Sequence, residues 1–325
     1  MKKLITRKRW KEQLRRRQIG ELSRRSRVKP QYRAAKKKRS FRDLSVPSVF
    51  SIINNSEEMN DFLQTLRWYA RTSHISLDLT DVTQITPEAI AALVATISQS
   101  SLPNTTVRGN MPSDLDAKRV LLDSGFFDHV KSTTELPKGR IGKIKEHNST
   151  LVEAETAWEL IECGTLQAFG ARKRSPSTRA AYNTLIELMC NTHNHAAKKG
   201  EETKHWWATV YGDSARRMVC YSFVDVGVGI FKSVNLHWVR KAFRHLGLND
   251  NSKLLLEILE GRVESSTGLS YRGNGLPTIY KKSQSGNIKA LHIISNDVYA
   301  DVSNGVYRTL NVSFPGTLFY WESEE

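Results

Sequence analysis

The sequence predicts an α/β protein in which a basic N-terminal arm precedes two folded α/β units. Three observations lead to this prediction. The excess positive charge is confined to the first 42 residues, which are poor in apolar side chains. Residues 75–125 alternate between strand-like and helix-like apolar patterns, and residues 151–322 place two helical patterns ahead of a series of strand patterns. Alternation of this kind is typical of α/β architectures.

Residues 1–42 form the predicted arm. They contain 19 lysines and arginines but only Glu12 and Glu21, a net charge of +17, whereas the whole chain carries +16. The segment has too few apolar residues to fold alone, and we expect it to be disordered or helical. Phosphate contacts by lysine and arginine release counterions, so nucleic acid is the expected partner. The alternative is a solvated tail or an anchor on an acidic protein or lipid surface.

The remaining composition predicts a soluble cytoplasmic protein. No stretch approaches the roughly 20 apolar residues that a membrane-spanning helix requires. No apolar run follows the first basic residues, as it would in a secretory signal. The three cysteines, Cys163, Cys190 and Cys220, form no CxxC pair, which favours a reducing compartment and argues against a zinc site.

The first folded unit is expected over residues 45–135. A strand at 75–80 is followed by Pro87, which suits the first turn of a helix, and then by apolar residues at helical spacing in EAIAALVATISQS. A second strand is expected at 105–110, followed by a second helix that stops at Gly125. This order predicts a small α/β unit.

The order of these elements resembles a STAS domain, the fold of anti-sigma-factor antagonists. In that family, the segment that follows a strand like LDLTDVTQI carries a serine that a partner kinase phosphorylates. This chain has Thr86-Pro87-Glu88-Ala89 at that place. Because the phosphoacceptor serine is missing, we interpret the unit as an interaction or packing module.

The second unit is expected over residues 138–325, and a helical pair at 151–169 and 175–199 opens it. Ser175 or Ser177 could cap the second helix, and Pro176 suits its first turn. The later elements are an inserted helical segment at 235–262, a helix at 275–285, and strands at 205–212, 216–226, 288–295, 305–314 and 316–322. Helices followed by a mostly antiparallel sheet predict a two-layer α/β sandwich.

One helix of this unit carries a polar stripe within the sequence ELMCNTHNHA. Glu187, Asn191 and His195 are four residues apart and therefore share one face of the helix. Apolar residues such as Leu185 and Leu188 lie around the rest of the helix and could be buried. Taken alone, the stripe could be an exposed polar face, and the glycine pairs in DVGVG and GNG could be tight turns.

The segments ELMCNTHNHA, VDVGVGI, RGNGLPTIY and FPGTLFYW, in this order, resemble the GHKL superfamily of ATPases, which share the Bergerat fold. The stretch from Glu187 to Ala196 is most similar to the anti-sigma-factor kinase branch. The resemblance covers about residues 150–325. It implies that the second unit binds ATP together with Mg²⁺.

The resemblance also implies a role for each site residue. Asn191 would be the magnesium ligand, because Mg²⁺ takes few protein oxygens beside water and phosphate. Glu187 would act as the general base for attack on the γ-phosphate, and Asp225 would accept a hydrogen bond from the adenine amino group. The other expected nucleotide-binding residues are His195, Gly227, Gly229, Gly273, Asn274, Gly275, Leu276 and Thr317.

These residues contribute in different ways. The glycines would let the base, the ribose and the phosphates approach the backbone, with phosphate oxygens at the start of the helix near Leu276. Thr317 would support Asp225 through a water molecule. His195 would contact the nucleotide region, or would be only a hydrogen-bonded histidine at a helix end.

Three functions are consistent with these features. The first is an ATP-dependent regulatory switch, an ATPase that contacts a protein partner or nucleic acid and that dimerises, by analogy with the family. The second is a protein serine/threonine kinase of the anti-sigma type. The third is a nucleic-acid-binding protein that senses ATP without hydrolysing it, and the presence of Glu187 argues against this function because a sensor needs no base.

Overall fold

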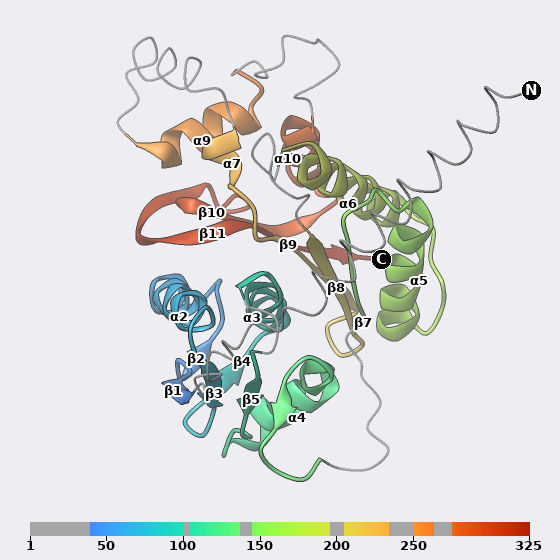
Figure 1. The fold of residues 1–325 in the computed structure, drawn as a ribbon. Coiled ribbons are helices and arrows are strands. Elements are labelled where there is room, and N and C mark those ends of the chain that lie inside the picture. Colours follow the sequence, from blue (N-terminus) through green and yellow to red (C-terminus); the bar gives the residue numbers. More distant parts are fainter. Residues whose placement is uncertain (1–39, 101–104, 137–144, 196–204, 234–249, 263–274) are drawn as a thin grey trace, which may run out of the picture. The chain divides into compact units, whose positions relative to one another are not determined.

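In the computed structural model of the chain, the described residues are 40–100, 105–136, 145–195, 205–233, 250–262 and 275–325. They form a mixed α/β structure with a four-stranded parallel sheet, a two-stranded parallel sheet and a five-stranded antiparallel sheet (Figure 1). Residues 40–325 belong to one compact unit. No helix among the described residues is long and apolar enough to cross a membrane.

The first part of this unit is built on a parallel sheet. Its strands are ordered β1-β3-β5-β6, and a small parallel pair, β2 and β4, lies beside it. In chain order the elements are β1 Phe41–Ser45, β2 Val49–Phe50, α2 Ser56–Tyr69, β3 His74–Asp78, β4 Gln84–Ile85, α3 Pro87–Ser100, β5 Val107–Gly109, α4 Leu115–Asp123, a 3₁₀ turn Phe126–Asp128 and β6 Lys131–Ser132.

The predicted elements of this part are confirmed. Helix α3 begins at Pro87, as expected for a proline in a first turn, and nearly all of its apolar residues are buried. The Asp114 carboxylate caps α4 by accepting the Ala117 N–H at 2.8 Å. Gly125 follows α4 with a φ of 73°, a conformation that glycine adopts without strain.

The second part of the unit is built on an antiparallel sheet, whose strands are ordered β10-β11-β9-β8-β7. In chain order its elements are β7 Lys145–Ser149, α5 Ala154–Phe169, α6 Pro176–His195, β8 Trp206–Asp213, β9 Met218–Asp225, α7 Ile230–Ser233, α9 Asn251–Leu259, α10 Gly275–Gln284, β10 Lys289–Asp301 and β11 Val306–Glu324. The predicted mostly antiparallel sheet is thus confirmed, and β8 and β9 are antiparallel neighbours in it.

The antiparallel sheet is buried on both faces. Trp206, Tyr221 and Phe319 belong to the same hydrophobic core as helices α5, α6, α9 and α10. Their neighbours Trp207 and Leu318 belong to the core that α2 and α3 form. Because successive strand residues point to opposite faces, the helices α2 and α3 lie between the two sheets (Figure 1). The two parts therefore share one of the two cores.

Three expectations about the elements are wrong. The helical pair does not open the second part, because β7 precedes it and pairs with β8 at the edge of the sheet. The sequence of β7, KEHNS, has no alternation of apolar residues from which a strand could be predicted. The first strand begins at Phe41, within the range expected for the arm.

The third correction concerns residues 305–322, which were expected to form two strands and form one. Only Pro315 separates the two predicted strands, at 305–314 and 316–322, and β11 continues through it. Opposite Pro315 and Gly316, Ser295 pairs with Thr317 and Asn296 with Phe314, so two residues of β11 are extra at this point. This bulge lets the strand continue past a proline that cannot donate a ladder hydrogen bond.

Candidate functional site

Helix α6 carries the predicted polar stripe, and its start is fixed by Ser175. The Thr178 N–H donates to Ser175 Oγ at 3.3 Å, and the Ser175 N–H donates to Thr178 Oγ1 at 2.7 Å. This reciprocal arrangement, with Pro176 as the first helical residue, is a strong helix-start signal. Further along α6, Leu188 and Met189 are buried against the sheet, as the apolar spacing predicts.

Glu187 and Asn191 lie on the remaining face of α6, where both are half-buried. They meet the first residue of α10, because a Cβ atom built on Gly275 would lie 2.7 Å from Glu187 Oε2 and 3.6 Å from Asn191 Nδ2. Gly275 therefore leaves the space that the Glu187 carboxylate occupies. The structure thus brings together three residues that the sequence analysis selected from two motifs far apart in the chain.

Lys282, two turns further along α10, is a site residue that the sequence analysis missed. Its Nζ atom is buried and has no hydrogen-bond partner among the described residues. Burial lowers the pKa of this ammonium group, and the nearby charge of Glu187 partly opposes that shift. An ammonium group beside the candidate base is suited to an anionic ligand. The sequence did not indicate this role, because nothing in it distinguishes Lys282 from a lysine on the surface.

Asp225 ends strand β9, where it pairs with Trp206 on one side and Thr317 on the other. Desolvation by burial raises the pKa of its carboxyl group to about 7, and the Gly227 N–H, which donates to Asp225 Oδ1 at 2.9 Å, works in the opposite direction. The structure therefore places Asp225, Gly227 and Thr317 together. A desolvated carboxylate with a free acceptor position is suited to a buried donor on a ligand.

The loop after Asp225 is held by the bulged part of the sheet. The Ile230 N–H donates to Ser295 Oγ at 2.9 Å, and Ser295 Oγ in turn lies 3.0 Å from the Gly316 carbonyl oxygen and 3.1 Å from Thr317 Oγ1. Gly229 has a φ of 78°, and a Cβ atom there would meet Asn296 Oδ1 at 2.3 Å. The loop glycine is thus required for both conformation and space.

Asn296 is the second residue that the sequence analysis missed. Its Nδ2 donates to the Val228 carbonyl oxygen at 3.0 Å, and its Oδ1 accepts the Phe231 N–H at 3.3 Å. Its own φ is 52°, which is uncommon for a non-glycine residue. The sequence around it, HIISNDV, does not mark this position, because the role of Asn296 comes from the loop that it binds.

The structure describes the remaining predicted site residues only in part. Leu276 is the second residue of α10 and is half-buried. His195 is the last residue of α6, and its side chain lies outside the described structure, as do Gly273 and Asn274 altogether. No group of three or more His, Cys, Asp or Glu residues that could hold a metal occurs in the described part of the chain. A magnesium site with one amide ligand would not form such a group.

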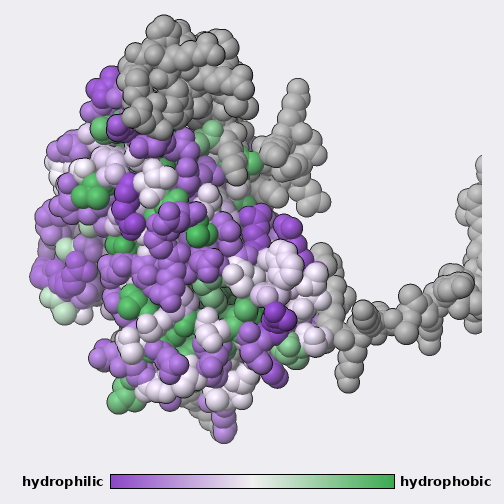
Figure 2. All heavy atoms as spheres, turned by 90° about the vertical axis from the view of Figure 1, so that its left-hand side faces the viewer, coloured by the Kyte–Doolittle hydropathy of each residue, from purple (hydrophilic) through white to green (hydrophobic). Residues whose placement is uncertain are grey.

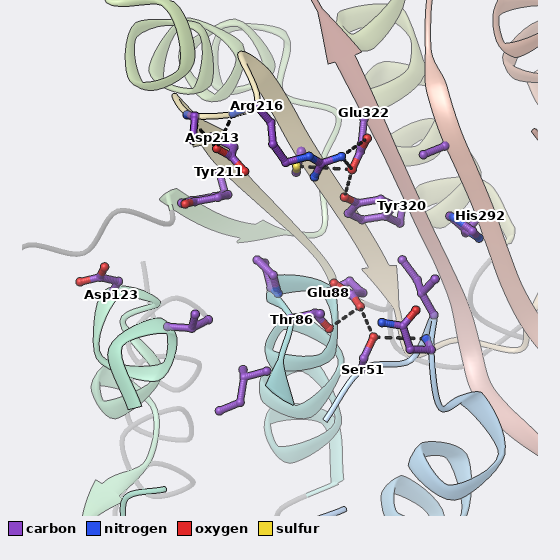
Figure 3. Close-up of a pocket in the computed structure, with 18 of the residues that line it drawn as sticks. Ser51, Thr86, Glu88, Asp123, Tyr211, Asp213, Arg216, His292, Tyr320 and Glu322 are labelled. Carbon is purple, nitrogen blue, oxygen red and sulfur yellow. Dashed lines mark hydrogen bonds and ion pairs between the residues drawn. The ribbon is translucent and has the colours of Figure 1, made fainter. Parts of the chain in front are cut away.

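A separate cavity of about 810 Å³ lies among residues of both parts of the unit (Figure 3). At one side of it, Glu88 accepts hydrogen bonds from the hydroxyl groups of Thr86 and Ser51, and burial raises the pKa of the Glu88 carboxyl group. The Thr86 hydroxyl group is therefore already bound to a neighbouring side chain.

At the other side of this cavity, Glu322 is the centre of a second cluster. Arg216 donates to both of its carboxylate oxygens, at 3.2 and 3.1 Å, and the Tyr320 hydroxyl donates to Oε1 at 2.6 Å. Burial raises the pKa of the adjacent Cys220 thiol to about 12, so this thiol stays protonated. In the clusters around Glu88 and Glu322, the polar side chains form hydrogen bonds with one another. This indicates that both clusters have a structural role.

No protein-family model matches this chain, and no curated protein matches it. The interpretation of the site therefore depends on the geometry of its own residues.

Proposed function

We propose that the chain binds Mg-ATP in the manner of a GHKL-type ATPase with a Bergerat fold, and that it acts as an ATP-dependent regulatory switch. The observation that carries this proposal is the meeting of Glu187 and Asn191 with Gly275 at the start of α10. In this proposal, residues 40–135 are a STAS-like module that packs on the ATP-binding part.

The residues at the site fit the proposed ligand. Asp225 offers a desolvated carboxylate where the adenine amino group would be bound, and above a pH of about 7 that group is ionised and can only accept. Gly275 begins α10, and the first N–H groups of this helix would bind phosphate oxygens. Lys282 offers an ammonium group that has no described partner.

The chemistry of the switch is assigned to the residues on α6. The Asn191 side-chain oxygen would be a protein ligand of Mg²⁺, and the bound ion would neutralise charge on the phosphates. Glu187 would accept the proton of the water that attacks the γ-phosphate, and its position beside Gly275 keeps it at the phosphate end of the site. Thr317 would hold Asp225 in orientation from the neighbouring strand.

A protein serine/threonine kinase is the alternative function for the same site. Glu187 would then accept a proton from a hydroxyl group of a partner protein instead of water. The Thr86 hydroxyl within the chain donates to Glu88 and is partly buried, which favours a substrate on another molecule. Transfer of label from ATP to a co-purifying protein would favour this alternative over the switch.

The basic arm would bind the partner of the proposed switch. Its charge favours nucleic acid, and we propose that residues 1–42 contact it mainly through phosphates. Replacing the lysine block Lys36, Lys37 and Lys38 with alanine in the full chain should weaken the binding of duplex DNA and reduce its salt dependence by up to about three units of slope. Unchanged binding would contradict this role of the arm.

The test of the ATPase proposal is phosphate release from Mg-ATP by the full chain, with and without nucleic acid. We expect Glu187→Gln to lower release at least 100-fold while ATP binding, measured by titration calorimetry, changes by less than about tenfold. Glu155→Gln, which alters an exposed glutamate on α5, is the matched control and should not change release. Loss of release in both variants, or in neither, would contradict the assignment of Glu187.

A further inference from the structure

The arginines of the described structure fall into two groups. Seven of them lie within 4.0 Å of a carboxylate oxygen: Arg119, Arg172, Arg174, Arg216, Arg217, Arg262 and Arg308. Four of those with no carboxylate partner among the described residues, Arg42, Arg67, Arg71 and Arg108, come from neighbouring elements. Arg42 is in β1, Arg108 is in β5, and Arg67 and Arg71 lie at the end of α2. Arg42 and Arg108 pair with Ile75 and Ser76, which point to opposite faces of the sheet, so this positive charge lies on both sides of it.

Aromatic rings accompany these four arginines. The Arg42 guanidinium lies 4.3 Å from the centre of the Tyr69 ring and donates to its hydroxyl at 2.6 Å. The Arg108 guanidinium lies 3.9 Å from the centre of the Phe41 ring, which is itself 5.2 Å from the His74 ring. We call the four arginines together with Phe41, Trp68, Tyr69 and His74 the aromatic–arginine surface.

The aromatic–arginine surface wraps around the edge strand β1. Phe41 pairs with His74, and successive strand residues point to opposite faces, so Phe41 lies on the face opposite to the buried Leu44. Arg42 has the other orientation and reaches Tyr69 at the end of α2. Residues from both sides of the strand therefore contribute to the surface, and the basic arm joins the body directly before this strand.

Trp68 is the most accessible ring of the aromatic–arginine surface. Its side chain is 64% exposed, and its ring contacts Tyr69 edge-on, with 4.7 Å between the ring centres. Nearby, partial burial and the like charge of Arg71 lower the pKa of the Arg67 guanidinium group. The two guanidinium groups repel each other, and neither has a carboxylate partner among the described residues. A bound anion would relieve this repulsion.

This combination fits one class of ligand. Single-stranded nucleic acid offers phosphates for arginines and unstacked bases for exposed rings, and arginines placed over rings add to such stacking. A duplex hides its bases and would use the charge alone. On the side of the body that carries β1 and α2, hydrophobic residues are scattered among hydrophilic ones (Figure 2). That pattern differs from the apolar core of a stable protein–protein interface.

We propose that the aromatic–arginine surface of the folded body binds single-stranded nucleic acid. The inference deepens the nucleic-acid role in the proposed function, and it is independent of ATP. It assigns base stacking to Trp68 and Phe41 and phosphate contacts to Arg42, Arg67 and Arg71.

The test uses the full chain and fluorescence anisotropy with three labelled probes: a 20-nucleotide oligo-dT, a 20-nucleotide oligo-rU and a 20-base-pair duplex. We expect Trp68→Ala to weaken binding of the single strands about 5- to 100-fold, as for the loss of one stacked base. Binding of the duplex should change less than threefold. Arg71→Ala should lower the salt slope with all probes by about one unit.

The controls separate this proposal from the role of the arm. Arg179→Ala removes an arginine that also lacks a described carboxylate partner but lies on α6, and Leu115→Ala removes an exposed apolar side chain on α4. Neither should affect single-strand binding. A selective loss in Trp68→Ala with DNA, RNA or both supports the proposal, even if the variant of the arm lysines is unaffected. Equal loss with single strands and duplex, or wild-type binding by Trp68→Ala and Arg71→Ala, overturns it.

Discussion

At the scale of single residues, Asp225 combines a candidate function with a cost to stability. Its carboxyl group is desolvated at the end of β9, where it accepts a hydrogen bond from the Gly227 N–H. A carboxyl group that must ionise away from water destabilises the folded chain. Such groups are found where they bind a ligand. Asn296 is a similar case, because it holds a positive φ while it binds the loop.

Asp225→Asn should therefore stabilise the protein in a pH-dependent way. The pKa of Asp225 rises from 3.8 to about 7 on folding, so the folded state is favoured below pH 4 and loses this advantage as the pH rises to 7. We expect the variant to be more stable than the wild type by up to about 4 kcal/mol at pH 8 and equally stable near pH 4. Urea unfolding at the two pH values measures this difference, and a gain that is the same at both would contradict it.

Gly275 should be tested together with Glu187. In the wild-type background, Gly275→Ala places a methyl group 2.7 Å from Glu187 Oε2, and we expect a loss of about 1 kcal/mol in stability and at least tenfold in phosphate release. In the Glu187→Ala background the same substitution should be neutral or stabilising by up to about 1 kcal/mol, because alanine favours a helix more than glycine. Equal effects of the alanine in both backgrounds would show that the two residues are not in contact.

At the scale of elements, two glycines set the distance between α5 and the sheet. A Cβ atom at Gly212 in β8 would lie 2.4 Å from the Gly164 carbonyl oxygen and 2.6 Å from the Ala168 nitrogen. A Cβ atom at Gly164 would lie 2.4 Å from Val219 Cγ1. Helix α5 and the sheet can pack this closely only because these two positions carry no side chain.

Gly212→Ala should therefore cost about 1–3 kcal/mol of stability, because backbone atoms of α5 would have to move. Gly305→Ala is the comparison, since its Cβ atom would meet nothing within 4 Å and the substitution carries only the strain of a φ of 69°. Thermal unfolding of both variants measures the difference. A smaller cost for Gly212→Ala than for Gly305→Ala would show that α5 can shift without loss.

The elements also show what could be predicted from the sequence. Helices α3, α4, α5 and α6 were predicted because their apolar spacing and their start signals agree, as at Pro87 and Ser175. Strand β7 carries no such pattern, since its pairing with β8 is made by backbone atoms. The continuity of β11 through Pro315 depends on a bulge that only the partner strand reveals.

The candidate site could be predicted to a similar degree. Glu187, Asn191 and Gly275 stand in recognisable motifs, and the structure brings them together. Lys282 and Asn296 could not be found in this way, because their importance comes from neighbours distant in sequence. Side-chain burial and hydrogen bonding across the sheet are tertiary properties. They cannot be predicted from the presence of a lysine or an asparagine in the sequence.

At the scale of the whole described body, the two sheets are held together by α2 and α3. Residues of α2 and α3 share a core with Trp207, Val224 and Leu318 of the antiparallel sheet. Hydrogen bonds reinforce the contact, since Asn60 Nδ2 donates to the Val312 carbonyl oxygen and Gln64 Nε2 to that of Ser313. Neither part can bury its apolar surface without the other.

We therefore expect residues 40–325 to unfold in one cooperative transition. Differential scanning calorimetry of the full chain should give a single endotherm whose calorimetric and van't Hoff enthalpies agree. Leu318→Ala, which empties a fully buried position in the shared core, should shift the whole endotherm downward. Two endotherms, of which only one responds to Leu318→Ala, would show two independent domains.

Strand β11 has a further consequence, which follows from its unbroken length. Thr317 pairs with Asp225 at one point of the strand, and only four to six residues earlier Asn311, Val312 and Ser313 are bonded to α2. At about 3.3 Å per residue these points would be roughly 13–20 Å apart in a regular strand, and the bulge at Pro315 and Gly316 brings them closer. The far end of α2 carries Trp68 and Tyr69. A displacement of this strand at one point would therefore have to work against the bonds at the other.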